Sequence, residues 1–236
     1  MIKDVWESIR RENLTLEKLA KTIDHSLVGP LVTDEQVREG CEIGKRYLTN
    51  SVFVKPYHVP LAVKLLRGTG VKVGTVVGFP HGCSTPQTKA FEARQAVEMG
   101  AEELDVVSNF AATLAGDYDL LREDIGAVVE ASKGVIVKII LENCYLTREQ
   151  KIKVCQIAEE MGADFVKTST GFGTGGASVE DVRLMRETVS PKVGVKAAGG
   201  IRSLEKALEI LEAGANRIGA TATIKILESF KEYSGK

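Results

Sequence analysis

Short β-branched runs alternate with longer amphipathic segments along nearly the whole chain, and this alternation constrains the fold more than any other feature. Eight runs have the length and composition of strands. They cover residues 22–26, 51–55, 72–78, 103–108, 135–141, 164–169, 193–197 and 217–219. Segments with the apolar spacing of helices lie between them, at residues 34–47, 59–66, 87–99, 117–131, 148–161, 179–188 and 204–213.

Eight strand–helix units that repeat every ~25 to 30 residues predict an α/β fold, a single (β/α)8 or TIM barrel. The strands are almost continuously hydrophobic, as expected when both faces are covered. The competing architecture is an open, doubly wound sheet, but no G-x-G-x-x-G sequence follows the first strand. We expect residues 1–236 to form one domain, with residues 1–20 as an extra N-terminal helical segment.

The composition excludes several classes of protein. The formal net charge is -1, from 31 basic and 32 acidic side chains, which is unlike the basic footprint of a nucleic-acid binder. The sequence has no apolar stretch of the ~18 residues that span a bilayer, and its charged N-terminus is unlike a secretory signal. We therefore expect a cytoplasmic protein without membrane or nucleic-acid partners. The four cysteines and three histidines are dispersed, so neither a disulfide framework nor a metal site is predicted.

Three lysines interrupt the strand-like runs at an even spacing. Lys138, Lys167 and Lys196 are 29 residues apart, on three successive predicted strands. Lysine is rarely buried without a partner, and burial or a second ammonium favours the neutral amine, which forms Schiff bases with carbonyl compounds. Asp105 and Asp24 add carboxylates on two other strands, and the ends of all these strands meet at one mouth. The alternative is that the lysines reach solvent, that Lys138 is only a salt-bridge partner, and that Asp105 merely neutralises a lysine.

Glycine-rich loops follow the last three predicted strands, at residues 168–176, 199–203 and 219–222. Glycines let backbone N–H groups approach an anion closely, and the loops after the seventh and eighth strands hold phosphate in many barrels. Together with the amine chemistry, these loops predict a small phosphorylated carbonyl compound as substrate. A glycine-rich loop alone can also be a simple turn.

Two motifs resemble those of a known family. Residues 167–173, Lys-Thr-Ser-Thr-Gly-Phe-Gly, and 195–202, Val-Lys-Ala-Ala-Gly-Gly-Ile-Arg, are similar to deoxyribose-phosphate aldolases, which are class I (Schiff-base) aldolases. The resemblance extends over about residues 22–224. Further matches lie at residues 23–27, 78–80, 88–92, 104–107, 137–142 and 217–219.

The resemblance implies reversible cleavage of 2-deoxy-D-ribose 5-phosphate to D-glyceraldehyde 3-phosphate and acetaldehyde, in deoxyribose phosphate catabolism. By match to the motifs, Lys167 forms the imine. Lys196 stands beside it as an ammonium that lowers its pKa and joins the proton relay. Asp105 acts as general acid and base through an ordered water. The protonated imine is the electron sink, so the resemblance implies no cofactor and no metal.

The remaining site residues are also carried over from the resemblance. Asp24 would orient Lys196 or the relay, and Ser26 and Lys138 would contact the substrate. The other substrate and phosphate contacts would come from Thr170, Gly171, Gly199, Gly200, Arg202, Gly219 and Thr221.

The chain departs from the family pattern at two positions. Ala222 interrupts the usual serine-rich last loop, so the phosphate would have one donor fewer. Phe53 stands where a cysteine on the side of the pocket is frequent, although it can equally be core packing.

Other functions stay open at this level. One is a different Schiff-base aldolase or a phosphate-binding barrel isomerase that acts on another sugar phosphate. Another is a non-catalytic barrel that binds sugar phosphates. We expect a homo-oligomer, either a homodimer or a homotetramer.

Overall fold

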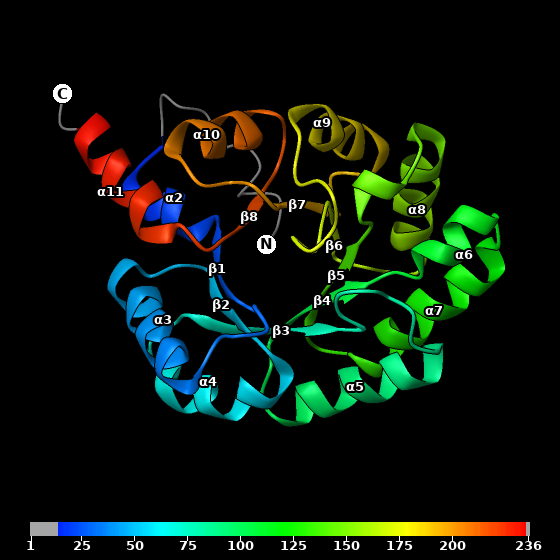
Figure 1. The fold of residues 1–236 in the computed structure, drawn as a ribbon, viewed down its shortest axis with the longest axis horizontal. Coiled ribbons are helices and arrows are strands. Elements are labelled where there is room, and N and C mark those ends of the chain that lie inside the picture. The colour runs from blue at the N-terminus through cyan, green and yellow to red at the C-terminus, as the bar shows by residue number, and fades with distance from the viewer. Residues whose placement is uncertain (1–13, 235–236) are drawn as a thin grey trace.

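The computed structural model describes residues 14–234 and contains a closed barrel of eight parallel strands, which confirms the predicted fold (Figure 1). Each strand pairs with the next in sequence, and β8 closes the ring against β1. The strands are β1 (Ile23–Leu27), β2 (Ser51–Val54), β3 (Lys72–Val77), β4 (Glu103–Val107), β5 (Ile136–Ile140), β6 (Phe165–Lys167), β7 (Gly194–Ala198) and β8 (Arg217–Ala220).

Helices surround the barrel on its outer side. They are α2 (Leu16–Lys21), α3 (Asp34–Tyr47), α4 (Val59–Leu66), α5 (Pro86–Glu98), α6 (Phe110–Ala115), α7 (Tyr118–Ala131), α8 (Arg148–Glu160), α9 (Val179–Thr188), α10 (Leu204–Glu212) and α11 (Thr223–Ser234), with short 3₁₀ turns at Pro56–His58 and Asn143–Tyr145. None of these helices is both long and apolar enough to cross a membrane.

Two helices were missing from the sequence-based assignment. α6 is only six residues long, and α11 is the helix that the eight-unit repeat implies after the last strand, for which no residue range was assigned. Of the N-terminal segment at residues 1–20, the described part contains α2, which lies against α11. The rest of that prediction falls on residues 1–13, outside the described residues.

Local sequence signals set where the helices begin. Thr33 and Thr147 each form a capping box, in which the threonine hydroxyl accepts the N–H three residues on while Gln36 or Gln150 accepts the threonine N–H. Thr85 and Ser178 cap α5 and α9 in the same way, without the reciprocal bond. These caps satisfy backbone donors that the first helical turn leaves unpaired.

The hydrophobic core lies mainly between the strands and the helices. Its buried members include Ile23, Leu104, Ile139 and Val195, which alternate along the strands with residues that point into the barrel. The barrel interior is different, because buried charged side chains occupy much of it. Branched aliphatic residues dominate the interior of most such barrels. The interior of this barrel therefore differs from the usual one in holding charged side chains in place of aliphatic ones.

Two buried phenylalanines fill the interior beside glycines on the next strand. A Cβ at Gly74 would lie 2.4 Å from the ring of Phe53, and a Cβ at Gly194 would lie 2.2 Å from the ring of Phe165. A side chain at either glycine would displace a ring that is buried and closely packed. The glycines on β3 and β7 therefore make room for the aromatic rings of β2 and β6.

We predict that Gly194→Ala lowers the free energy of unfolding by about 1–3 kcal/mol, because overpacking forces the Phe165 ring from its position. Gly126→Ala is the matched control. Gly126 lies inside α7 and its added Cβ would meet only the flexible Met161 side chain at 3.4 Å, so alanine should stabilise the protein by about 0.5–1 kcal/mol. Urea unfolding measures both changes. Equal effects of the two variants would contradict the packing argument.

Candidate active site

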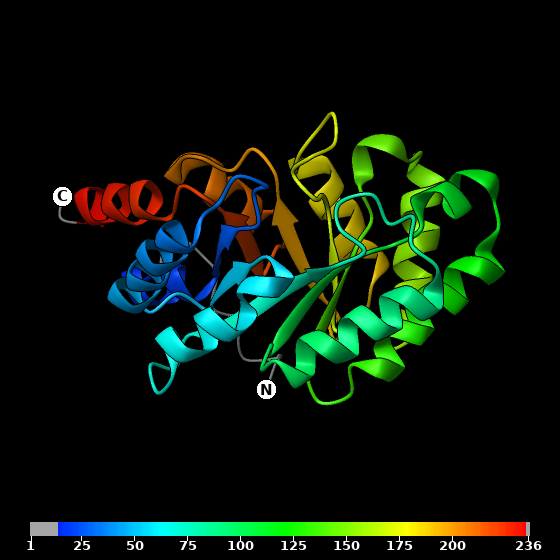
Figure 2. The same ribbon diagram turned by 60° about the horizontal axis from the view of Figure 1, so that its bottom comes forward.

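A cavity of about 280 Å³ opens at the carboxyl ends of the strands. Figure 2 shows the loop after β6, in yellow, rising beyond these ends. The residues that line the cavity include nearly all of the predicted site residues, which are Asp24, Ser26, Asp105, Lys167, Thr170, Gly171, Lys196, Gly199, Gly200, Arg202, Gly219 and Thr221. Lys138 is absent from the lining.

Asp105 is the centre of the polar cluster at the cavity floor. Its Oδ2 lies 2.6 Å from Lys167 Nζ and 2.7 Å from Lys196 Nζ, and its Oδ1 lies 3.3 Å from Lys138 Nζ. The strand register explains this convergence, since Asp105 pairs with Lys138 across β4 and β5, and Lys167 pairs with Lys196 across β6 and β7. One carboxylate thus holds three amines from three successive strands.

Two further carboxylates complete the cluster. Asp24 Oδ2 lies 2.6 Å from Lys196 Nζ, and Asp24 Oδ1 accepts hydrogen bonds from Ser51 and Arg217. Glu103 lies deeper in the barrel, with its Oε2 2.5 Å from Lys138 Nζ and 3.3 Å from Arg217. Neither Glu103 nor Arg217 was among the site residues predicted from the sequence. Both begin their strands, a position that usually faces solvent.

The buried cluster has one more cation than it has carboxylates. Its carboxylates are Asp24, Glu103 and Asp105, and its cations are Lys138, Lys167, Lys196 and Arg217. Lys72 also reaches Glu103, but from the solvent-exposed rim. Excess charge in a site of low dielectric constant is costly, so loss of one lysine proton is favoured. An arginine does not supply that proton, because its pKa is too high.

Exposure and partners distinguish the three lysines. Lys138 is fully buried beneath the cavity, so its position argues against the predicted substrate contact and favours the alternative of a salt-bridge partner. Lys196 is held by two carboxylates and lies over the Phe53 ring. Lys167 reaches the cavity with Asp105 as its one carboxylate partner among the described residues. Lys167 is therefore the amine that is best placed to leave its ion pair and attack a ligand.

The pKa values follow from burial and from these ion pairs. Burial lowers the pKa of Lys196 to about 8, although Asp105 and Asp24 act in the opposite direction. Burial alone would raise the pKa of Asp105, but Lys167, Lys196 and Lys138 together bring it below its usual value. For Lys138 the effect of burial is outweighed by Glu103, Asp105 and Asp24, so its pKa is raised. Lys196 therefore stays mostly charged at pH 7 beside an ionised Asp105.

The glycine-rich loops that follow β6, β7 and β8 form another part of the cavity wall. Gly171, Gly199 and Gly200 have φ of +88°, +87° and +80°, in the left-handed region that favours glycine. The backbone N–H groups of Gly171, Gly200 and Thr221 donate no hydrogen bond to any of the described residues. Free N–H groups that line a cavity suit an anionic ligand.

Glu142, which was not among the site residues predicted from the sequence, holds the loop after β6 in place. Its carboxylate accepts the N–H of Thr170 at 3.3 Å and also the Thr170 hydroxyl. Glu142 has φ of +57°, which is uncommon for a residue other than glycine and points to a site that requires it. Only the motif at residues 137–142 could have drawn attention to it.

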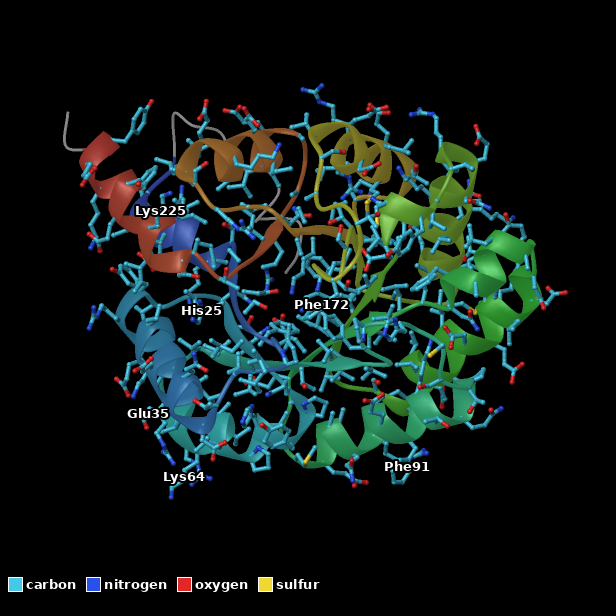
Figure 3. All side chains as sticks on the ribbon, viewed as in Figure 1. His25, Glu35, Lys64, Phe91, Phe172 and Lys225 are labelled. Carbon is cyan, nitrogen blue, oxygen red and sulfur yellow. The ribbon has the colours of Figure 1, made fainter. Side chains whose placement is uncertain are left out.

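Two aromatic rings meet above the cavity. Phe172, on the loop after β6, contacts Phe79, on the loop after β3, with ring centroids 5.4 Å apart at 88°. Figure 3 shows Phe172 near the middle of the ring of strands, whereas Phe91 and Lys64 project from the outer helices. This edge-to-face pair joins the loops after β3 and β6, two strands that are not neighbours in the ring. The sequence alone gives no signal for such a contact.

From the contacts in the ion cluster we predict how the free energy of unfolding changes when its charges are removed. Glu103→Gln should lower the free energy of unfolding by about 3–5 kcal/mol, because Lys138 loses its closest partner while it stays buried. Glu103→Gln/Lys138→Met removes both charges and should recover much of this loss. Urea unfolding of wild type, both single variants and the double variant measures the coupling. If the effects of the two single variants simply added up in the double variant, Glu103 and Lys138 would not be coupled, and the prediction would be wrong.

Comparison with known proteins agrees with this geometry. The model of the DeoC/LacD family of aldolases matches residues 16–229. A deoxyribose-phosphate aldolase from Clostridium tetani is 54% identical over 215 residues, covering 91% of this chain and all of the relative. One from Caldanaerobacter subterraneus is 52% identical over 221 residues, covering 92% of this chain and 96% of the relative.

A solved structure is similar over almost the whole chain. The deoxyribose phosphate aldolase from Aeropyrum pernix, described as a unique tetramer, superimposes with a TM-score of 0.88 at 33% sequence identity, and the match covers 98% of each chain. The family model spans most of the sequence, and the relatives match over nearly their full length. The chain therefore belongs to the DeoC/LacD family of aldolases and is a lyase.

Proposed function

We propose that this aldolase reversibly cleaves 2-deoxy-D-ribose 5-phosphate to D-glyceraldehyde 3-phosphate and acetaldehyde through a Schiff base on Lys167. The observation that carries the proposal is the contact of Lys167 Nζ, at the cavity wall, with a carboxylate that is shared with Lys196. The names of the relatives support the substrate. No cofactor enters the proposed chemistry.

The reaction begins at the aldehyde carbon, C1, of the open-chain sugar. The neutral amine of Lys167 adds to C1, and loss of water from the carbinolamine gives a protonated imine. This imine draws electrons from the bond between C2 and C3 as the C3 hydroxyl loses its proton. That bond breaks, glyceraldehyde 3-phosphate leaves with C3 as its aldehyde, and an enamine of acetaldehyde stays on Lys167. Protonation at C2 and hydrolysis then release acetaldehyde.

Asp105 and Lys196 supply and remove the protons in this scheme. The Asp105 carboxylate bridges the two amines at 2.6 and 2.7 Å, so it can pass a proton between Lys196 and the groups that react on Lys167. Asp24 holds Lys196 in position from the other side.

The phosphate of the substrate would lie against the glycine-rich wall. The N–H groups of Gly171, Gly200 and Thr221 have no partner among the described residues and line the cavity. The loops that carry Gly200 and Thr221 lead into α10 and α11, whose N-terminal dipoles favour an anion. Arg202 lines the same wall and adds a positive charge. Ser26 would contact the sugar from β1.

We further propose a homo-oligomeric assembly, a homodimer or a homotetramer. The tetrameric relative from Aeropyrum pernix supports association of this kind. The cytoplasmic location expected from the sequence stays a prediction.

Borohydride trapping tests the proposal. Reduction in the presence of 2-deoxyribose 5-phosphate should leave a stable ethyl group or sugar phosphate adduct on Lys167, because borohydride reduces the imine before it hydrolyses. Mass spectrometry of peptides locates the adduct. The same treatment of Lys167→Ala, and of wild type without the sugar phosphate, should leave the peptide unmodified.

A panel of carbonyl compounds tests the substrate. Unphosphorylated 2-deoxyribose should be trapped and cleaved only at much higher concentration, because it lacks the anion that the glycine-rich wall would hold. An adduct on Lys196 in place of Lys167 would contradict the assignment of the nucleophile. Turnover of another sugar phosphate without turnover of 2-deoxyribose 5-phosphate would support a different aldolase or an isomerase, and binding without an adduct would support a non-catalytic barrel.

A further inference from the structure

Phe53 makes an unusual pair of contacts in the barrel interior. Its ring is almost fully buried, with 2% of its surface exposed. Lys196 Nζ lies 3.8 Å from the ring centroid, and Lys138 Nζ lies 4.5 Å from it. Phe53 also lines the cavity in which Lys167 is found. The ring therefore touches both the ion cluster and the space for the substrate.

The ring is fixed in this orientation by its surroundings. Two of its atoms, Cε2 and Cζ, come within 2.4 Å of the place where a Cβ at Gly74 would lie. Only glycine on β3 allows the ring to lie there, and close packing then prevents it from turning away. Packing therefore fixes the orientation of the Phe53 ring, with its π face toward the ammonium groups of Lys196 and Lys138.

The face of an aromatic ring attracts a cation, and the attraction is strongest where water is excluded. Lys196 is buried, which disfavours its charged form. The Phe53 ring is a partner that stabilises the ammonium without adding a negative charge to the cluster. The charged groups that face or adjoin Lys196 from other strands are Asp24 on β1, Asp105 on β4, Lys138 on β5, Lys167 on β6 and Arg217 on β8.

We propose that Phe53 is a positioning residue of the reaction, whose π face keeps Lys196 charged and directed at Asp105. The inference rests on the proposed function, because Lys196 has its role there as an ammonium. Phe53 does not exchange protons or form bonds. It acts through Lys196.

A second phenylalanine offers a matched control. Phe165 is also buried in the barrel and also packs against a glycine, Gly194. Its ring centroid lies 5.4 Å from Arg217 and 5.9 Å from Lys138 Nζ, and no contact with Lys196 is found among the described residues. Changes at Phe165 therefore test the general effect of altering a buried ring, without altering the partner of Lys196.

The experiment replaces Phe53 with phenylalanine that carries one or three ring fluorines, and separately with leucine. Fluorine weakens the attraction of the π face for a cation while the ring keeps nearly the same shape. The readout is kcat/KM for cleavage of 2-deoxyribose 5-phosphate as a function of pH. In wild type the alkaline limb should reflect the loss of the Lys196 proton, near pH 8.

The alkaline limb should move to lower pH as fluorines are added, and by about one pH unit in Phe53→Leu. The sign follows because removing a partner of the ammonium favours the neutral amine, so Lys196 loses its proton at lower pH. The same fluorinated residues at position 165 should leave the limb in place. Thermal unfolding of every variant shows whether the fold is retained.

Two results would overturn the inference while the proposed function stands. The first is a wild-type enzyme that cleaves the sugar phosphate while fluorination at position 53 leaves the alkaline limb unmoved. The second is an equal shift from fluorination at positions 53 and 165. If the wild type formed no borohydride adduct and cleaved no 2-deoxyribose 5-phosphate, the proposed function itself would be wrong. The wild-type assay alone detects this failure, without any variant at position 53 or 165.

Discussion

The site depends on one carboxylate that is shared by three amines. Asp105 contacts Lys138, Lys167 and Lys196, which come from three successive strands of the barrel. Burying four ionisable groups is expensive unless each finds a partner at close range. A closed parallel barrel makes this possible, because adjacent strands place their inward side chains at matched heights. The amines can therefore be concentrated in the buried interior of the barrel.

The rest of the interior is arranged around this cluster. Glu103 and Arg217 continue the alternation of charges below Asp105 and Asp24. Phe53 and Phe165 close the space around the charges, each beside a glycine that makes room for it. An aliphatic interior would pack well but could not bring a reactive amine beside a second cation. Charged side chains thus replace part of the aliphatic core inside the barrel. The layer between the strands and the helices buries most of the apolar surface instead.

Much of the fold and the centre of the site could be predicted from the sequence, for physical reasons. Lys167, Lys196 and Asp105 were recognisable because charges inside apolar strands need an explanation. Glu103 and Arg217 were not, because a charge at the first position of a strand normally reaches water. The contact of Phe172 with Phe79 and the bonds from Thr170 to Glu142 join loops that are far apart in sequence, so no local pattern reveals them. The short helix α6 has too few turns to give a periodic signal.

Neutron diffraction of the unliganded protein at pH 7 is the most direct test of this account, because it locates the protons of the cluster. We predict no deuterium on the carboxylates of Asp24, Glu103 and Asp105, and a complete ammonium on Lys138, in keeping with the direction of their pKa shifts. A deuterium on Asp105, or a neutral Lys138, would contradict the claim that an ionised carboxylate organises the amines.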